Sequence, residues 1–196
     1  MARRPRTQFP DARFHIFNRG VNRCLIYHDD QDRRVFLKIL HSALMEFGLT
    51  LYAYCLMSNH YHLFMRISSA NLNKSMQKMQ SRYATYFNSR HDRVGYLFQG
   101  RYKSRLVEND SYSLAVVRYI HQNPSEIDKT KPPETYPWSS YPDYVQETQP
   151  QLKLLNTDWI LSQFHEDSKK ARLLFKKFHN ARVPEGSEAS DPYDPN

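Results

Sequence analysis

Residues 51–67, LYAYCLMSNHYHLFMRI, decide the fold, because they read as two apolar strands joined by a turn at Ser58-Asn59. Just after the turn, His60 and His62 lie two positions apart, and such residues on a strand point to the same face. Both imidazoles can therefore bind one divalent metal ion, provided that the chain supplies a further ligand. The triplet alone is weak evidence, since about 0.4 H-x-H triplets arise by chance with 9 His in 196 residues, and two surface histidines are the simpler interpretation.

The composition is that of a folded protein with one sizeable domain, with 40% hydrophobic and 14% aromatic residues in 196. No apolar stretch is long enough to span a bilayer, and the arginine-containing N-terminus lacks the apolar core of a secretory signal. Cys24 and Cys55 form no C-x-x-C pair, so we expect reduced thiols in a cytoplasmic protein without a membrane partner.

The charge predicts a polyanionic partner, because the net charge is +8 and the isoelectric point is near 9.4. Between Arg66 and Arg105 the only acidic residue is Asp92, whereas an ordinary solvated face would mix acids among the bases. Exposed aromatic rings in this stretch could stack on unpaired bases, although most of its aromatic residues are expected in the core. The best candidates for phosphate contacts are Lys74, Lys78, Arg82, Arg101, Lys103 and Arg105.

The periodicity along the chain predicts an α+β domain with a mainly antiparallel sheet and helices packed on it. Strands are expected at residues 14–18, on both sides of the Ser58-Asn59 turn, and at 102–107. Helices are expected from Asp29 or Asp30 to about residue 47, from about 72 to 88, and from Asp110, as its cap, to just before Pro124.

The C-terminal third is predicted to be an extension of this domain. Residues 124–150 hold six of the 11 prolines and should be irregular but anchored by Trp138. Residues 152–182 should be helical and basic, and the acidic tail after Arg182 should be disordered. The expected layout is thus a flexible basic arm at 1–12, a catalytic domain at 13–124, the Pro-rich segment and C-terminal helices at 125–182, and the tail at 183–196.

The third predicted helix could complete the histidine site. Tyr119 and Asn123 are four residues apart and share one face, while Leu114, Val117 and Ile120 can face the sheet. If this helix lies beside the H-x-H strand, the Asn123 carbonyl oxygen can be a third metal ligand, with Tyr119 one turn away. A tyrosine hydroxyl, with a pKa of about 10, needs a phosphate that a cation has polarised. The simpler alternative is a packed tyrosine with Asn123 as a helix cap.

Several segments together resemble the REP-associated tyrosine transposases, a branch of the single-tyrosine HUH (IS200-like) transposases. These segments are FHIFNRG at Phe14, DDQDRRVFLKIL at Asp29, AYCLMSNHYHLF at Ala53, YFNSRHDRVGYLFQGRYKS at Tyr86, RYIHQNP at Arg118 and YPWSSY at Tyr136. They keep the family order and cover roughly residues 13–142. The resemblance implies a ferredoxin-like HUH fold, with His60, His62 and Asn123 as metal ligands and Tyr119 as the nucleophile. Tyr61, between the histidines, should point away from the metal.

The implied activity is metal-dependent nicking and strand transfer on single-stranded, hairpin-forming, REP-like DNA through a 5′-phosphotyrosine intermediate. Mg²⁺ or Mn²⁺ is the implied cofactor, although two imidazoles would also suit Zn²⁺. Arg3, Arg4 and Arg6 could form an arm that enters DNA, or a disordered tail. The resemblance also implies a bacterial, nucleoid-associated protein, and a monomer in preference to a homodimer.

Two other functions remain open from the sequence. The chain could be a hairpin-binding regulator that does not cut, but such a protein has no need of His60, His62, Tyr119 and Asn123 together. It could also be a hydrolytic metal nuclease in which water attacks and Tyr119 is structural. Only the transposase-like enzyme forms a covalent protein–DNA adduct.

Overall fold

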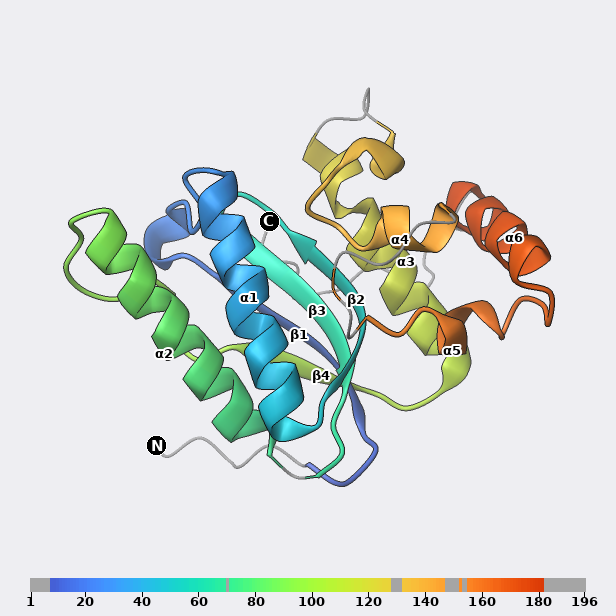
Figure 1. The fold of residues 1–196 in the computed structure, drawn as a ribbon, viewed down its shortest axis with the longest axis horizontal. Coiled ribbons are helices and arrows are strands. Elements are labelled where there is room, and N and C mark those ends of the chain that lie inside the picture. The colour runs from blue at the N-terminus through green and yellow to red at the C-terminus, as the bar shows by residue number, and fades with distance from the viewer. Residues whose placement is uncertain (1–7, 70, 128–131, 147–151, 153–154, 182–196) are drawn as a thin grey trace.

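A computed structural model describes residues 8–69, 71–127, 132–146, 152 and 155–181. Its first six main elements are β1 (Arg13–Arg19), α1 (Asp30–Phe47), β2 (Thr50–Leu56), β3 (His60–Arg66), α2 (Leu72–Arg90) and β4 (Lys103–Val107). Four helices follow, namely α3 (Asp110–Ile127), α4 (Tyr141–Val145), α5 (Asp158–Leu161) and α6 (Ser168–Asn180). Short 3₁₀ turns lie at Val21–Arg23 and Pro133–Thr135. Figure 1 shows α1 and α2 over one face of the sheet and α3 to α6 gathered to its other side. No described helix is long and apolar enough to cross a membrane.

The four strands form one sheet in the order β2-β3-β1-β4, and every neighbouring pair is antiparallel. With the chain order β1-α1-β2-β3-α2-β4, this is the ferredoxin-like arrangement. The predicted α+β class and antiparallel sheet are therefore confirmed. The two strands of the 51–67 stretch form the predicted hairpin, in which Leu56 pairs with Tyr61.

The first core lies between the sheet and the helices α1 and α2. Asp29 caps α1 by accepting a hydrogen bond from the Asp32 N–H, and Gly48 ends the helix in the left-handed conformation, with φ of 60°. Alternate strand residues point into this core, as Tyr61 does, and its ring is fully buried there. Tyr61 thus points away from the face that carries His60 and His62, as predicted. The main contributors to this core are Ile16, Leu63, Met65, Phe36, Leu40, Leu44, Met76, Met79 and Tyr83.

A second core lies on the opposite face of the sheet, under α3, α4 and α6. Val117 and Ile120 of α3 are fully buried against Cys55 and Phe64 of the sheet, and Leu114 is partly buried there. Residues 138–140 run along the outer edge of β2, where Leu56 N–H donates to the Trp138 carbonyl and Ser140 N–H donates to the Tyr54 carbonyl. This segment covers the edge strand and ties the C-terminal helices to the domain.

Two sequence-based expectations are wrong in detail. The third helix does not stop before Pro124 but continues to Ile127. Pro124 removes one backbone hydrogen bond, and a packed helix can tolerate that loss near its end. Its cap is Asn109, whose side chain accepts from the Tyr112 N–H, while Asp110 pairs with Arg13 at 2.6 Å. The C-terminal region holds the predicted helices, as α5 and α6, and Asp167 starts α6 by capping it.

The Pro-rich segment is more ordered than predicted. It contains the 3₁₀ turn Pro133–Thr135 and the short helix α4, and its backbone as well as Trp138 anchors it to β2. The Trp138 ring itself is partly buried against the first core. The acidic tail and the N-terminal arginines Arg3, Arg4 and Arg6 lie outside the described residues, so their predicted disorder and DNA contacts stay predictions.

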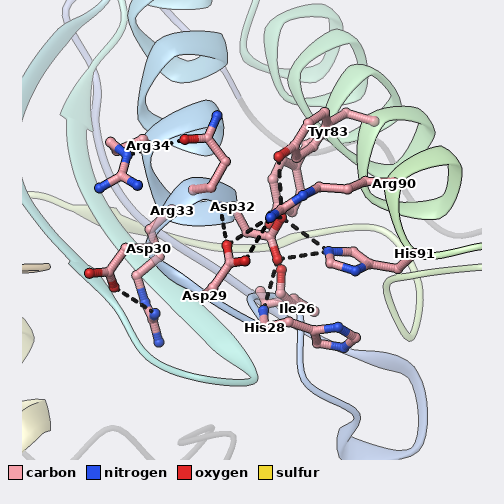
Figure 2. A network of polar contacts seen from close by, with 12 residues as sticks. Ile26, His28, Asp29, Asp30, Asp32, Arg33, Arg34, Tyr83, Arg90 and His91 are labelled. Carbon is pink, nitrogen blue, oxygen red and sulfur yellow. Dashed lines mark hydrogen bonds and ion pairs between the residues drawn. The ribbon is translucent and has the colours of Figure 1, made fainter.

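A buried carboxylate joins the start of α1 to the end of α2 (Figure 2). Asp32 is 0% exposed, and its carboxylate accepts from the His28 N–H at 2.8 Å, Arg90 Nη1 at 2.5 Å and His91 Nε2 at 2.9 Å. Arg90 also pairs with Asp29 at 2.7 Å. Burial alone would raise the pKa of Asp32, but these hydrogen bonds outweigh it and the pKa is lowered. We define these residues, Asp29, Asp32, Arg90 and His91, as the Asp32 cluster.

Candidate metal and nucleophile site

The strand β3 places both histidines of the H-x-H motif on the face of the sheet that α3 covers. His60 is 2% and His62 0% exposed, and their ring centroids are 5.1 Å apart with the planes nearly perpendicular. Phe64, two residues further on, continues the same face into the second core. The hairpin therefore aims both rings into one enclosed region, as the period of a strand requires.

Hydrogen bonds on the inner ring nitrogens fix how the two histidines are turned. His60 Nδ1 lies 2.7 Å from Asn59 Oδ1, and because that oxygen can only accept, Nδ1 carries the proton. His62 Nδ1 lies 2.9 Å from Nε2 of His15, a buried histidine on the neighbouring strand β1. In both rings Nε2 remains as the nitrogen that can bind a metal ion, and a hydrogen bond at the opposite nitrogen is typical of metal-binding histidines.

Burial lowers the pKa of two of these histidines, His62 and His15. Burial lowers the pKa of His62 well below its usual value, and the neighbouring His15 and His60 lower it further. Burial, with a smaller contribution from Arg105, lowers the pKa of His15 to about 3. A lowered pKa favours neutral imidazole, which is the form that binds a metal.

Helix α3 brings Tyr119 and Asn123 over these rings. The Tyr119 ring meets His62 and His15 edge-on, with centroid distances of 5.4 and 5.7 Å. Asn123 is 1% exposed, and its Nδ2 donates to the Tyr119 carbonyl at 3.0 Å. Asn123 therefore lies inside the helix, which continues to Ile127, and does not close it. The alternative in which Asn123 caps the helix is thus wrong.

The buried donor atoms fit a divalent cation. His62 Nε2 and Asn123 Oδ1 are both inaccessible to solvent and find no hydrogen-bond partner among the described residues. Buried polar atoms are normally paired, so such atoms point to a group that the chain itself does not supply. Two imidazole nitrogens and an amide oxygen suit Mn²⁺, Mg²⁺ or Zn²⁺. No described group of three or more His, Cys, Asp or Glu side chains is arranged to hold a metal, so a complete ligand set needs a donor of another kind, such as the Asn123 oxygen.

Two basic residues of β4 share the face of the sheet that carries the histidines. Arg105 pairs in register with His15, and Lys103 pairs with Phe17, so both side chains lie on this face. Lys103 Nζ is 5.7 Å from the centroid of the Phe17 ring, which itself stacks on His62. Arg105 Nη1 donates to the Tyr112 hydroxyl at 3.3 Å. The two cations thus flank the histidines and Tyr119.

The other predicted phosphate contacts are not brought to this face. Lys74, Lys78 and Arg82 are exposed along α2, which covers the opposite face, and Arg101 is exposed in the segment before β4. Some bases that lack acidic neighbours in the sequence find them in space, as Lys78 does with Glu46 at 2.5 Å and Arg66 with Asp11 at 3.2 Å. The shortage of acids within residues 66–105 therefore overstates the number of unpaired cations.

Sequence reasoning missed His15 as a member of the site. The motif FHIFNRG was noted, but no role was given to its histidine. The alternation of β1 could have shown that His15 and Phe17 share a face, but only the strand pairing shows that this face is the one that carries His62.

Comparison with known proteins identifies the class to which the chain belongs. The family model "Transposase IS200 like" matches residues 8–123, more than half of the chain, so the chain belongs to the IS200-like transposase family. The resemblance found in the sequence motifs is thereby confirmed. Membership gives the protein a transposase-type role in DNA processing.

Solved structures share the fold. A REP-associated tyrosine transposase bound to a REP hairpin is similar with a TM-score of 0.64 and 14% identity, over 81% of this chain and 91% of that chain. A transposase-type protein from Deinococcus radiodurans R1 is a weaker match, with a TM-score of 0.43 and 15% identity over 65% of this chain and 97% of that chain. No curated protein sequence matches the chain.

Proposed function

We propose that this protein is a metal-dependent nickase and strand transferase that acts on single-stranded, hairpin-forming DNA through Tyr119. The observation that supports this most is the meeting of Tyr119 with the neutral pair His62 and His15, beside the unpartnered oxygen of Asn123. The hairpin substrate is proposed by analogy with the similar transposase, which was bound to a REP hairpin.

Tyr119 would attack the phosphorus of the scissile phosphodiester. A bond forms between the tyrosine oxygen and phosphorus, the bond from phosphorus to the 3′ oxygen breaks, the tyrosine loses its proton and the 3′ oxygen gains one. The product is a 5′-phosphotyrosine and a free 3′-OH. Because the phosphodiester energy is kept in this link, a second 3′-OH can reverse the step and join strands without ATP.

His60 and His62, through Nε2, and Asn123, through Oδ1, would hold Mg²⁺ or Mn²⁺. When bound, the cation supplies positive charge that makes the scissile phosphate electrophilic. His15 would accept the hydrogen bond of His62 Nδ1 and keep the His62 ring turned toward the metal. Lys103 and Arg105 would bind phosphates that flank the cleaved one.

The proposal is tested by trapping the covalent adduct on denaturing gels with a labelled single-stranded hairpin and Mn²⁺. The wild-type chain should form an adduct, and Tyr119→Phe should form none while still folding and binding the hairpin. Tyr83→Phe is a matched control, since Tyr83 is a buried tyrosine of the other core whose hydroxyl donates to the Ile26 carbonyl. That variant should lose about 0.5–1.5 kcal/mol of stability but keep the adduct.

Each remaining outcome selects a different function. An adduct that persists in Tyr119→Phe would name another nucleophile, and Tyr112 on the same helix is the first to test because it contacts Arg105. Cleavage without any adduct would make the protein a hydrolytic metal nuclease. Binding without cleavage by the wild-type chain would make it a hairpin-binding regulator.

A further inference from the structure

The connection between β1 and α1 lies against the turn that precedes His60. Gly20 N–H donates to the Asn59 carbonyl at 2.8 Å, and Ile26 N–H donates to the Ser58 carbonyl at 3.0 Å. Both hydrogen bonds join backbone groups, so they hold the connection to the turn whatever side chains it carries. The cleavage step proposed above gives this part of the molecule no role.

The backbone of this connection is tightly bent. Asn22 and Arg23 have positive φ of 51° and 59°, a region that residues other than glycine rarely occupy. At Gly20 a Cβ would clash with the Cys24 carbonyl oxygen, so a side chain there would force the connection to shift. Such conformations persist where the surrounding structure fixes them. In this connection the Arg23 carbonyl is directed toward the Asn59 side chain.

The Arg23 carbonyl and the His60 ring contact opposite ends of one amide group. Asn59 Nδ2 donates to the Arg23 carbonyl at 3.3 Å, and Asn59 Oδ1 lies 2.7 Å from His60 Nδ1. Because a carbonyl oxygen can only accept, the amide NH₂ group must face Arg23, and the amide oxygen must therefore face His60. That oxygen can also only accept, so in a neutral His60 ring the proton lies on Nδ1 and the lone pair lies on Nε2.

The two histidines of the motif thus depend on different supports. Nδ1 of His62 faces His15, which is buried in the sheet, whereas Nδ1 of His60 faces a side chain at a partly exposed turn. Water competes for hydrogen bonds at such a turn. The second hydrogen bond of the amide, to the Arg23 carbonyl, opposes rotation of Asn59 and keeps its oxygen toward His60.

We propose that Asn59 is a positioning residue of the metal site, which holds His60 in the tautomer and ring orientation that metal binding needs. A hydrogen bond at the nitrogen opposite the metal is usual for histidine ligands, and its loss weakens metal binding. The inference rests on the proposed function, because it takes His60 to be a metal ligand. It extends the functional unit from the H-x-H triplet to Asn59 and, through the Arg23 carbonyl that orients the amide, to the connection between β1 and α1.

The first measurement uses the metal-free chain and long-range proton–nitrogen NMR correlation, which identifies the protonated nitrogen of a neutral imidazole. The His60 signals are assigned by their loss in His60→Gln. In the wild-type chain His60 should carry its proton on Nδ1. In Asn59→Ala the form protonated on Nε2 should appear, and this form cannot bind a metal through that nitrogen. Asn59→Asp keeps an acceptor oxygen and should restore the wild-type tautomer.

The second measurement is the Mn²⁺ affinity, followed by electron paramagnetic resonance without DNA. Asn59→Ala should weaken Mn²⁺ binding roughly 10- to 100-fold, and Asn59→Asp should recover most of the loss. Ser58→Asp added to Asn59→Ala brings the same charge without the hydrogen bond, and should not recover it. Arg23→Ala is the matched control, because it keeps the backbone carbonyl that Asn59 contacts and should bind Mn²⁺ like the wild-type chain.

Three results would overturn the proposal. The first is an unchanged His60 tautomer in Asn59→Ala, whatever its Mn²⁺ affinity. The second is equal Mn²⁺ affinity in Asn59→Ala and Asn59→Asp. The third is recovery by Ser58→Asp, which would show that charge near the turn, and not the hydrogen bond to His60, decides the affinity.

These outcomes are distinguishable from a failure of the proposed activity. If the variants change the tautomer and the Mn²⁺ affinity as expected but the wild-type chain forms no covalent adduct, the positioning role of Asn59 stands and the proposed activity fails. If the adduct forms and Asn59→Ala keeps both the Nδ1 proton and the Mn²⁺ affinity, the positioning role alone fails.

Discussion

Two buried polar clusters, one on each face of the sheet, differ in how their atoms are paired. Under α1 and α2, Asp32 is fully buried, and both of its carboxylate oxygens are paired with Arg90, His91 or the His28 N–H (Figure 2). Under α3, His62 Nε2 and Asn123 Oδ1 are equally buried and have no hydrogen-bond partner among the described residues.

The contrast distinguishes a structural cluster, that of Asp32, from the site that we propose to be functional. Removing one partner of a paired buried ionic group is strongly destabilising, whereas an unpaired buried acceptor already costs free energy in the folded chain. At His62 and Asn123 the unpaired atoms are of the kinds that bind a divalent cation, which is why we propose the site on the face under α3. Each cluster contains a histidine: His91 is paired with Asp32, whereas Nε2 of His62 has no hydrogen-bond partner among the described residues.

The largest expected effect is on the face under α3. His60→Ala or His62→Ala should abolish Mg²⁺- or Mn²⁺-dependent cleavage while leaving hairpin affinity largely intact, because phosphate contacts dominate that affinity. Mn²⁺ binding, followed by electron paramagnetic resonance, should be lost in parallel. His41→Ala on α1 is the control, and normal cleavage by the His60→Ala/His62→Ala double variant would refute the site.

Breaking the Asp32 cluster should do the reverse. Asp32→Ala should lower the free energy of unfolding by about 3–5 kcal/mol, because Arg90 and His91 lose the carboxylate that pairs with them. Urea unfolding measures the loss. Mn²⁺ binding by the fraction that remains folded should be unchanged, and the exposed Asp30→Ala should change stability by no more than about 0.5 kcal/mol. Lost metal binding in folded Asp32→Ala would mean that the two faces are coupled.

His15 offers a finer test of the face under α3. His15→Leu removes the acceptor for His62 Nδ1–H and should weaken Mn²⁺ binding roughly 10- to 100-fold. His15→Gln can still accept that hydrogen bond and should restore most of the affinity. His179→Leu breaks another buried histidine pair, with His121 at 3.3 Å, and should leave Mn²⁺ affinity unchanged. Equal affinities in His15→Leu and His15→Gln would show that His15 only fills space.

Acid should affect buried histidines before it affects Asp32. Burial lowers the pKa of His179 to about 3. Below about pH 6.5 this imidazole therefore binds a proton in the unfolded chain but not in the folded chain. Stability is therefore full above pH 6.5 and falls as the pH drops toward 3, by at most about 1.4 kcal/mol per pH unit for this group. The lowered pKa of Asp32 acts only below about pH 3.9. Urea unfolding between pH 7 and 4.5 should show a shallower slope in His179→Leu and an unchanged one in Asp32→Asn.

The smallest effect concerns the cations of α2. Lys78→Ala with Arg82→Ala should weaken DNA binding for all sequences and reduce the slope of log affinity against log salt by about 0.7–0.9 per lost phosphate contact. Lys78 already pairs with Glu46, so its share should be the lesser of the two. Lys169→Ala with Lys170→Ala on α6 makes the same change in net charge and should leave the slope unaltered.

Local patterns were enough to predict most elements and the class of protein. The Asp29 cap, the Gly48 stop and the period of two around Ser58-Asn59 are written in neighbouring residues, so α1 and the β2–β3 hairpin follow from the sequence. The same period puts His60 and His62 on one face. The motif order was also sufficient for family membership, which the match over residues 8–123 confirms.

What the sequence could not decide depends on contacts between distant segments. The end of α3 was misjudged because packing against β2 and β3 outweighs the local penalty of Pro124. His15 joins the site only through the register of β1 with β3, and Glu46 neutralises Lys78 only because α1 lies against α2. Sequence periodicity determines which way a side chain points, but the partner it meets there depends on how separate elements pack, and that is a property of the tertiary structure alone.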